Sequence, residues 1–578
     1  MKIQINRVFY NFIILLFLMS CSNNSGLSND EKITIYKTSL NTFFDDDNLI
    51  VSINSANDLL NVQFEDGNSV SLEKKLVSVE NNFWNKKFNF IDGSSLSIGS
   101  INDDLNIDFE VSNFALPLSK NFEIEIPFNG FINWVTYGRN GESSNINSHD
   151  IPVSPGINNF LVHGLYVDGI TEVSIFYKNS KNNIRYSKKF NLNSTEFSET
   201  IDSINIITTV NSQPEVQRFV LFCHRSGSGP FVVDQFGDFR YYLNVKPSDI
   251  GNPFYGLKQT SDKTLIWAET NKIYEYDING NLITEHNIPE KYGRIHHDIL
   301  KLEDQKYLLT VNNNELTTIE DIIILYDVSS QDVIKEWDLN ISVPKSDYFI
   351  GSDGFTDTWN DWFHTNAIEY VDFDQSLLIS GQRSGVVKIS WDNELIWFLT
   401  DKKRFLNESA EIRNKILFNT YDEIITWGQH NIKYDSVNND YYLFDNGLGR
   451  NYEHLDLFSR GVKFDVNEDD FTYEILDTYG EDYPEYHSPI ISGIDFLENG
   501  NVLNLFGSIG YELTYTNNKD WLGRIWKNPQ PDYGAAIQEY DINGNLILEF
   551  QISSVVSNES HRFYNRDPGI YRASYFNF

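Results

Sequence analysis

The stretch that decides the fold is DWFHTNAIEYVDFDQSLLISGQRSGVVKISWDNELIWFL, Asp361 to Leu399. It divides into three or four short strands, HTNAIEY, SLLIS, GVVKIS and ELIWFL, which polar turns separate. In an antiparallel meander the second strand returns to the end from which the first departs. The pattern therefore predicts that His364, at the start of the first strand, and Arg383, after the second, lie side by side at one mouth of the sheet.

Three other segments begin with a histidine and continue as strand, turn and strand. They are HDILKLEDQKYLLTVN from His297, HNIKYDSVNNDYYLFDNGLGR from His430 and HSPIISGIDFLENGNVLNLFG from His487. With His364, these histidines are 67, 66 and 57 residues apart. A four-stranded unit repeated about every 40 to 50 residues or more is typical of a β-propeller, whose inner strands face one axis. The repeat therefore predicts that the histidines converge on one opening.

Two Asn-Gly hairpins support an all-β fold. YEYDINGNLITEHNI (274–288) and QEYDINGNLILEFQI (538–552) both place Asn-Gly between alternating strands, which is the strongest short-range hairpin signal. We expect a six-bladed β-propeller in which the unit at 538 completes a blade begun near residue 230. Only a short stretch, 407–416, reads as helical.

The amino-terminal residues read as an export signal. Lys2 and Arg7 precede the apolar run Phe12 to Met19, which is too short for an ordinary membrane span. The sequence LMSC, Leu18 to Cys21, at the end of this run resembles a bacterial lipobox. Residues 1–20 are therefore predicted to be a lipoprotein signal peptide, and Cys21 to be lipidated. We expect an exported lipoprotein of the cell envelope, periplasmic or anchored to the outer membrane.

The rest of the chain divides into three parts. Residues 21–110 are predicted to be a tether and a small β-rich region. Residues 111–200 show alternating segments about every 12 residues, as in an Ig-like β-sandwich. His149 and His163 fall in this part and are interpreted as surface or core residues. The propeller domain is expected over 205–578.

Charge and residue types narrow the chemistry of the site. The net charge of −37 argues against nucleic acid and anionic lipid as partners. Clustered histidines and Arg383 would then form a local cationic pocket for an anion, because a planar guanidinium matches an oxyanion. A three-histidine metal centre is the alternative, although a guanidinium would repel a cation.

The separated motifs also resemble the bacterial arylsulfate sulfotransferases. The motifs are DWFHTNAIEYVDFDQSLLISGQRSGVVKI, the pair His297-Asp298, GQHNIKYDSVNNDYYLFDNGLGR and YHSPI, in the family's order. The resemblance implies a six-bladed propeller after an N-terminal β domain. It also implies transfer of a sulfuryl group from an aryl sulfate to a phenolic acceptor, with no nucleotide donor, cofactor or metal.

Residue roles follow from this resemblance. It places the transiently sulfurylated nucleophile on His430, the sulfate-holding groups on His297, His364 and Arg383, and a substrate-binding amide on Asn366. The expected mechanism is ping-pong transfer through sulfohistidine. We also allow for a homodimer. A family disulfide near the site is ruled out, because Cys223 is the only cysteine beside Cys21.

Three alternatives stay open from the sequence. Water in place of the phenol would make the protein a sulfatase. A propeller without catalysis could bind glycans or proteins. Metal-dependent hydrolysis is the third.

Overall fold

The computed structural model describes residues 50–56, 59–64, 69–82, 85–93, 95–99, 105, 107–109, 115–126, 129–139, 144–179, 184–194, 204–211, 217–224, 229–245, 254–303, 305–345, 360–448, 450, 458–497, 499–509, 511–515, 521–526, 534–554 and 570–578. The predicted signal peptide and Cys21 lie outside these ranges. The regular secondary structure of the described chain is almost wholly strand, which confirms the all-β prediction. Its helices are single turns: α3 (Leu339–Ser342), η2 (Lys402–Phe405), α4 (Ala410–Asn414) and η4 (Pro484–Tyr486). In these ranges no helix has the length and apolarity to cross a membrane.

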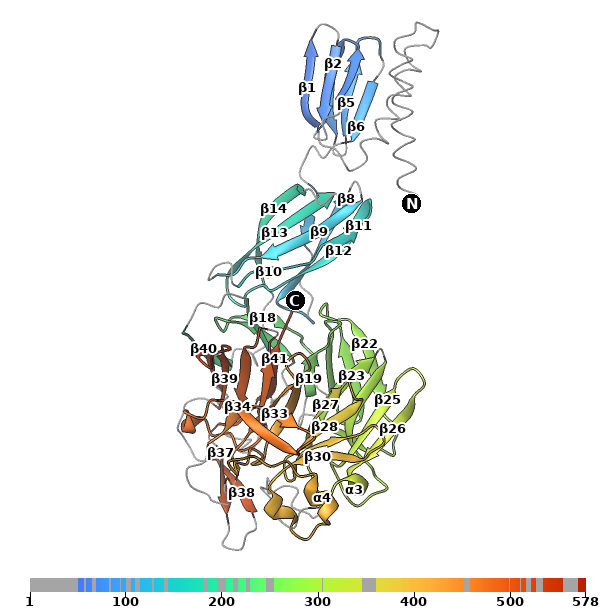
Figure 1. Ribbon diagram of the computed structural model, residues 1–578. Coiled ribbons are helices and arrows are strands. Elements are labelled where there is room, and N and C mark those ends of the chain that lie inside the picture. Colours follow the sequence, from blue (N-terminus) through green and yellow to red (C-terminus); the bar gives the residue numbers. More distant parts are fainter. Residues whose placement is uncertain are drawn as a thin grey trace, which may run out of the picture.

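The first described part of the chain forms two small sheets, at the top of Figure 1. Each has three strands in chain order. The strands are β1 (Ile50–Ala56), β2 (Leu59–Phe64) and β3 (Ser69–Glu73), then β4 (Leu76–Asn82), β5 (Asn85–Phe90) and β6 (Ser95–Gly99).

Two further sheets enclose a common apolar core in the middle of Figure 1. One has the order β10-β9-β13-β14, with β11 also on β9, and the other β12-β8-β7. Residues of β9 alternate between buried and half-buried, as expected for a strand with one face on a core. The strands are β7 (Ile107–Phe109), β8 (Ser119–Ile126), β9 (Gly130–Thr136), β10 (Ile146–Asn147), β11 (Ile151–Val153), β12 (Gly156–His163), β13 (Ile170–Asn179) and β14 (Ile184–Asn193).

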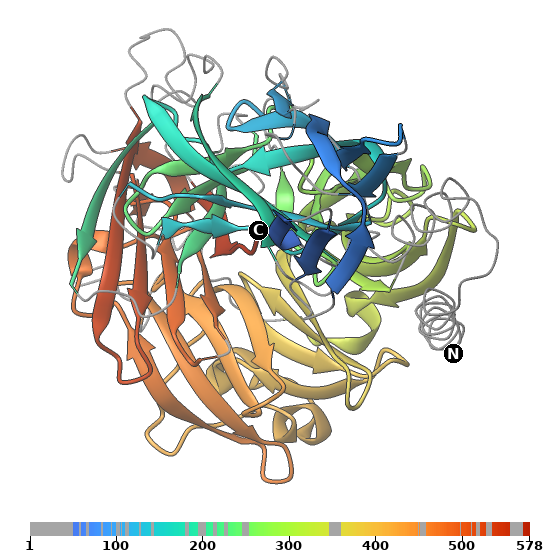
Figure 2. The same ribbon diagram turned by 90° about the horizontal axis from the view of Figure 1, so that it is seen from above.

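Residues 204–575 form six larger sheets in the described ranges, which succeed one another around the body from green to red in Figure 2. The first sheet contains β16 (Phe219–His224), β17 (Phe231–Asp234), β18 (Phe239–Tyr242) and β41 (Ile570–Tyr575), and the second contains β19 (Tyr255–Gln259), β20 (Leu265–Glu269), β21 (Lys272–Tyr276) and β22 (Leu282–Asn287). The third contains β23 (Arg294–Glu303), β24 (Lys306–Asn312), β25 (Ile322–Asp327) and β26 (Asp332–Asp338). The fourth contains β27 (Thr365–Val371), β28 (Ser376–Gly381), β29 (Gly385–Ile389) and β30 (Leu395–Leu399).

The fifth and sixth sheets complete this part. The fifth contains β31 (His430–Asp435), β32 (Asp440–Asp445), β33 (Arg460–Asn467) and β34 (Thr472–Tyr479). The sixth contains β35 (Gly493–Phe496), β36 (Val502–Phe506), β39 (Ala535–Tyr540), β40 (Leu546–Ser554) and β15 (Ile204–Val210). A hairpin of β37 (Tyr511–Tyr515) and β38 (Trp521–Trp526) lies between β36 and β39.

One strand from each sheet joins a closed ring. β19, β23, β27, β31 and β35 each contact the next, and β41 contacts both β35 and β19. The ring is closed by a strand from the end of the chain, because β41 pairs with β16. The expectation that the unit at 538 completes the blade begun near 230 is therefore wrong. That unit pairs instead with β36 and, through β40, with β15.

The local sequence explains the hairpins. The stretch 361–399 forms the predicted meander of four strands, β27 to β30. The two Asn-Gly hairpins are confirmed as β21-β22 and β39-β40. Gly280 and Gly544 have φ of 78° and 76° in these turns, a left-handed conformation that glycine adopts at little cost.

Apolar and polar contacts join the two-sheet unit to the larger sheets. Leu116, Ile146 and Leu161 share a buried cluster with residues of β16 to β20. His163 contacts Ser119 through Nδ1 at 2.9 Å and Asn279, in a turn of the second large sheet, through Nε2 at 3.0 Å. His163 is thus a buried packing residue, as the sequence interpretation had it.

Candidate active site

Bulges in the ring strands turn the site residues toward one another. The pairing register shifts between Ile295 and Ile299 on β23, between Thr365 and Ala367 on β27, and between His430 and Ile432 on β31. His297 and Asn431 lie in two of these bulges and His364 lies just before the third, and they have φ of 57°, 63° and 58°. Positive φ is uncommon outside glycine, and a bulge re-aims the side chains beside it.

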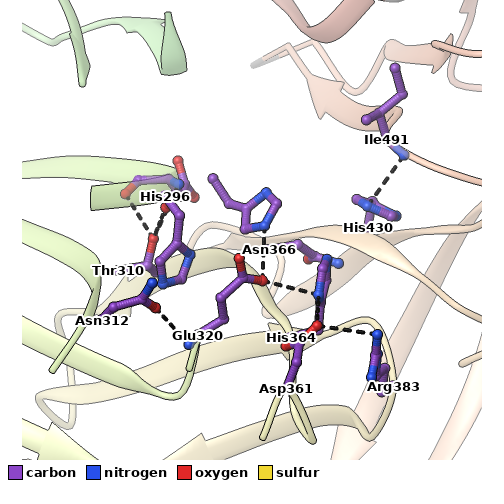
Figure 3. A network of polar contacts seen from close by, with 12 residues as sticks. His296, Thr310, Asn312, Glu320, Asp361, His364, Asn366, Arg383, His430 and Ile491 are labelled. Atoms are coloured by element: carbon purple, nitrogen blue, oxygen red, sulfur yellow. Dashed lines mark hydrogen bonds and ion pairs between the residues drawn. The ribbon is translucent and has the colours of Figure 1, made fainter. Parts of the chain in front are cut away.

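One carboxylate joins two of the predicted histidines. Oε2 of Glu320 lies 3.2 Å from Nε2 of His297 and 3.0 Å from Nδ1 of His364. The two imidazole centroids are 5.0 Å apart. Burial opposes ionisation of Glu320, but His364 and His297 hold its pKa well below the ordinary value. The structure thus brings His297 and His364 together around an anionic side chain that the sequence interpretation had missed. Figure 3 shows Glu320 beside His364.

Asp361 joins His364 to Arg383. Oδ2 of Asp361 lies 2.7 Å from Nδ1 of His364 and 3.2 Å from a terminal nitrogen of Arg383. Burial alone would lower the pKa of His364, but Asp361 and Glu320 outweigh it and raise the pKa well above its ordinary value. His364 is therefore an imidazolium at neutral pH. An imidazolium and a guanidinium lie beside one mouth of β27 and β28, as the meander predicts.

His430 is held in the opposite protonation state. Burial lowers its pKa well below the ordinary value, Arg572 lowers it further, and the hydrogen bond to Asn446 opposes both. Nδ1 lies 2.9 Å from Oδ1 of Asn446, and Nε2 accepts a hydrogen bond from the backbone N–H of Ile491 at 3.2 Å. His430 is thus a buried neutral imidazole, and the charges of His364 and His297 also act to lower its pKa.

Asn366 and Arg572 connect the two groups. Nδ2 of Asn366 donates to the carbonyl of Gln429 at 2.7 Å, which ties β27 to the residue before His430. Arg572 donates to the carbonyls of Asn366 and Ser492 at 2.8 and 2.6 Å. Oδ1 of Asn366 has no hydrogen-bond partner in the described structure although the residue is fully buried. In the described chain, the structure thus places all five predicted propeller residues in one connected region.

The last strand supplies a second residue that the sequence interpretation had missed. The hydroxyl of Tyr571 lies 2.6 Å from Nδ1 of His297, and the rings stack at 5.8 Å. Burial raises the pKa of Tyr571, so the phenol keeps its proton and can donate it to Nδ1. Because Nε2 of His297 faces the Glu320 carboxylate, it carries a proton. His297 is held at both nitrogens.

The adjacent His296 differs from His297. It is buried, and burial lowers its pKa to about 3. In the described structure neither of its ring nitrogens has a hydrogen-bond partner. His297, rather than His296, therefore contacts His364.

A belt of buried and half-buried charged residues also lies on the ring strands. Each strand contributes one member, and opposite charges are neighbours: Lys258 lies 2.8 Å from Asp298, and Lys433 lies 3.6 Å from Glu369. The three basic residues match the three acidic residues in number, so the belt has no net formal charge. The six residues are Lys258, Asp298, Glu369, Lys433, Asp495 and Arg572.

Comparison with known proteins assigns the chain to a family. The profile described as Arylsulfotransferase (ASST) matches residues 203–564, well over half of the chain. The chain belongs to the arylsulfotransferase family.

The relatives are distant. The chain is 25% identical over 348 residues to arylsulfate sulfotransferase AssT of Escherichia coli O6:H1 (strain CFT073), covering 48% of this chain and 57% of that protein. It is 24% identical over 366 residues to AssT of Lelliottia amnigena, covering 51% of this chain and 60% of that protein. The chain thus spans little more than half the length of these relatives. The comparison with solved structures includes a luciferin-regenerating enzyme at 8% identity and a TM-score of 0.26, covering 58% of this chain and 95% of that one. A similarity this low says nothing about the function of this chain.

Proposed function

We propose that the protein is an aryl-sulfate sulfotransferase that carries the sulfuryl group on His430. The observation that supports this most strongly is the contrast between two buried histidines. His430 is neutral with a ring nitrogen that accepts a hydrogen bond, whereas His364 is an imidazolium paired with carboxylates. A nucleophile needs the first state and a donor to sulfuryl oxygens needs the second.

In the first half-reaction, Nε2 of His430 gives up its hydrogen bond from the Ile491 N–H and attacks the sulfur of the aryl sulfate with the freed lone pair. The N–S bond forms while the bond from sulfur to the aryl oxygen breaks, and its electron pair leaves on the phenolate. Arg383 and His364 donate to the sulfuryl oxygens, as does the second N–H of Asn366 Nδ2, whose first N–H is bound to the carbonyl of Gln429. The leaving phenolate takes a proton from the imidazolium of His364 or from His297.

In the second half-reaction, a phenol enters and the same imidazole takes its proton. The phenolate oxygen attacks sulfur, the N–S bond breaks, and His430 regains its lone pair. The two halves together give ping-pong transfer, and no cofactor enters the balance.

The test is phenol release from a chromogenic aryl sulfate, with and without an added phenol. Wild type is compared with His430→Asn and with His149→Asn, a matched change at an exposed histidine of the two-sheet unit. We expect release that needs the acceptor, persists in His149→Asn and is lost in His430→Asn. Donor alone should leave one SO3 group on His430 by mass spectrometry. Equal release without acceptor would indicate a sulfatase, and no release with several donors would favour a binding propeller.

Metal-assisted hydrolysis is the second candidate, because the carboxylates supply ligands that the sequence interpretation had not included. The ligand atoms of His296, His297 and Glu320 lie within 4.8 Å of one another, as do those of Glu320, Asp361 and His364. Against this candidate, Arg383 is also bound to Asp361, and a guanidinium repels a cation. Loss of phenol release after chelation, with recovery on adding a divalent metal, would favour hydrolysis.

The remaining expectations complete the proposal. We propose that the six sheets are the blades of a propeller domain (205–578), that residues 111–200 are an Ig-like domain, and that residues 21–110 are a tether with a small β-rich region. Cys21 would be lipidated after cleavage of residues 1–20 and anchor the protein in the cell envelope. Loss of membrane association in Cys21→Ser, with activity kept, tests the anchor. The molecular mass of the full chain from analytical ultracentrifugation tests whether it forms a homodimer.

A further inference from the structure

Each ring nitrogen of His430 has a hydrogen-bond partner whose role as donor or acceptor can be decided. Nε2 lies 3.2 Å from the backbone nitrogen of Ile491. Because a backbone N–H can only donate, Nε2 is the acceptor (Figure 3). The single proton of the neutral ring therefore lies on Nδ1, which faces Oδ1 of Asn446 at 2.9 Å.

The orientation of the Asn446 amide is fixed by its other contacts. Its Nδ2 donates to the carbonyl oxygens of Ser488 and Ile491 at 2.6 and 3.0 Å. Carbonyl oxygens only accept, so the NH2 end must face them and Oδ1 must face His430. Reversing the amide would set an oxygen against two carbonyls in a fully buried position.

The two carbonyls belong to a turn with little freedom. The backbone N–H of Ser488 donates to the hydroxyl of Ser459 at 2.8 Å, and the hydroxyls of Ser488 and Ser492 lie 2.8 Å apart. Ile491 and Ser492 have φ of 50° and 88°. A β-branched residue rarely adopts this conformation unless its surroundings impose it.

We propose that Asn446 is the positioning residue that fixes the tautomer of His430 and so selects Nε2 as the nitrogen that takes the sulfuryl group. The part concerning the sulfuryl group rests on the proposed function; the part concerning the tautomer does not. Without Asn446 only the Ile491 N–H holds the ring. The ring can then turn away from that N–H and exchange its proton between nitrogens, so the lone pair no longer points in one direction.

The first test needs no substrate. Imidazole nitrogens of the full chain are labelled with ¹⁵N, and the signals of His430 are assigned by their absence in His430→Asn. We expect a protonated Nδ1 and an unprotonated Nε2 in wild type, and both tautomers in Asn446→Ala. Asn504→Ala, which removes another fully buried amide bonded to a carbonyl, is the control and should keep the wild-type signals. A proton on Nε2 in wild type, or an unchanged tautomer in Asn446→Ala, overturns the proposal.

The second test uses the reaction. Asn446→Ala should slow the first burst of phenol release by about 100-fold, the usual cost of a misplaced reacting group. It should also spread the sulfuryl group over both nitrogens. In Asn446→Asp, a carboxylate beside Nδ1 favours the imidazolium, so the acid limb of the rate profile should move to higher pH. If wild type and Asn446→Ala show the expected tautomers but wild type releases no phenol, the proposed function fails and the role of Asn446 stands.

Discussion

Oε2 of Glu320 contacts Nε2 of His297 and Nδ1 of His364 at 3.2 and 3.0 Å, so one oxygen serves two imidazoles. A carboxylate at the centre of an anion site lowers its positive charge. In return, it keeps His364 protonated, because Glu320 and Asp361 raise its pKa against the effect of burial. The negative charge of Glu320 thus keeps His364 available as a hydrogen-bond donor to a bound anion.

The first prediction concerns Glu320→Gln. The change removes one of the charges that raise the pKa of His364, so His364 should lose its proton at a lower pH than in wild type. The basic limb of phenol release should therefore move to lower pH. Glu315→Gln, at a largely exposed carboxylate, is the control. An unchanged basic limb in Glu320→Gln would show that His364 does not set it.

The second prediction concerns Arg383→Lys. A lysine keeps the charge but not the planar fork that matches sulfuryl oxygens, and it would also reach Asp361 differently. We expect kcat/KM for the aryl sulfate to fall by about 100-fold, the usual loss for one oxyanion donor. Steady-state kinetics measures it, with Arg413→Lys on α4 as the control. A fall of less than threefold would exclude a specific role for the guanidinium.

The third prediction concerns Tyr571→Phe. The phenyl ring can still stack on His297, but the hydroxyl that lies 2.6 Å from Nδ1 is lost. One hydrogen bond of about 1.5 kcal/mol corresponds to roughly a 10-fold lower kcat. Tyr326→Phe removes a comparable hydroxyl, 2.9 Å from Nδ1 of His286, and should leave kcat unchanged. Equal kcat values for wild type and Tyr571→Phe would show that the hydrogen bond from Tyr571 to His297 does not support the reaction.

The fourth prediction concerns stability and His163. Burial lowers its pKa from 6.5 to about 4, against the opposing effects of Asn279 and Asp277. Between these values the unfolded chain binds a proton that the folded chain does not, so stability falls as the pH falls from about 6.5 towards 4. The full loss is roughly 3 kcal/mol. Thermal unfolding of wild type and His163→Gln across this range measures it. The melting temperature of the variant should depend less on pH, and parallel curves would contradict the assignment.

The sequence predicts the strands and the histidines because both depend on local signals. The meander at 361–399 and the Asn-Gly hairpins have alternating residues and turn residues that decide their structure wherever they occur. His364 and Arg383 lie in one meander, so their proximity follows from strand order. The repeat spacing then extends the argument to His297 and His430.

The missed residues depend on contacts between distant segments. Glu320 lies in a loop of the third large sheet, and no repeat marks it. Tyr571 enters through β41, whose pairing with β16 joins the two ends of the ring. Asp361 is the exception: it lies three residues before His364, and this spacing was a signal that could have been used.

The place of β41 has a consequence for how the protein is made. Translation releases residues 204–554 first, and a ribosome that has not yet released residue 575 leaves the ring one strand short. Tyr571 and Arg572 are then missing from His297, Asn366 and Ser492. A chain that stops before β41 is thus expected to lack these contacts, and the proposed sulfuryl transfer would begin only once Ile570–Tyr575 has been made and paired.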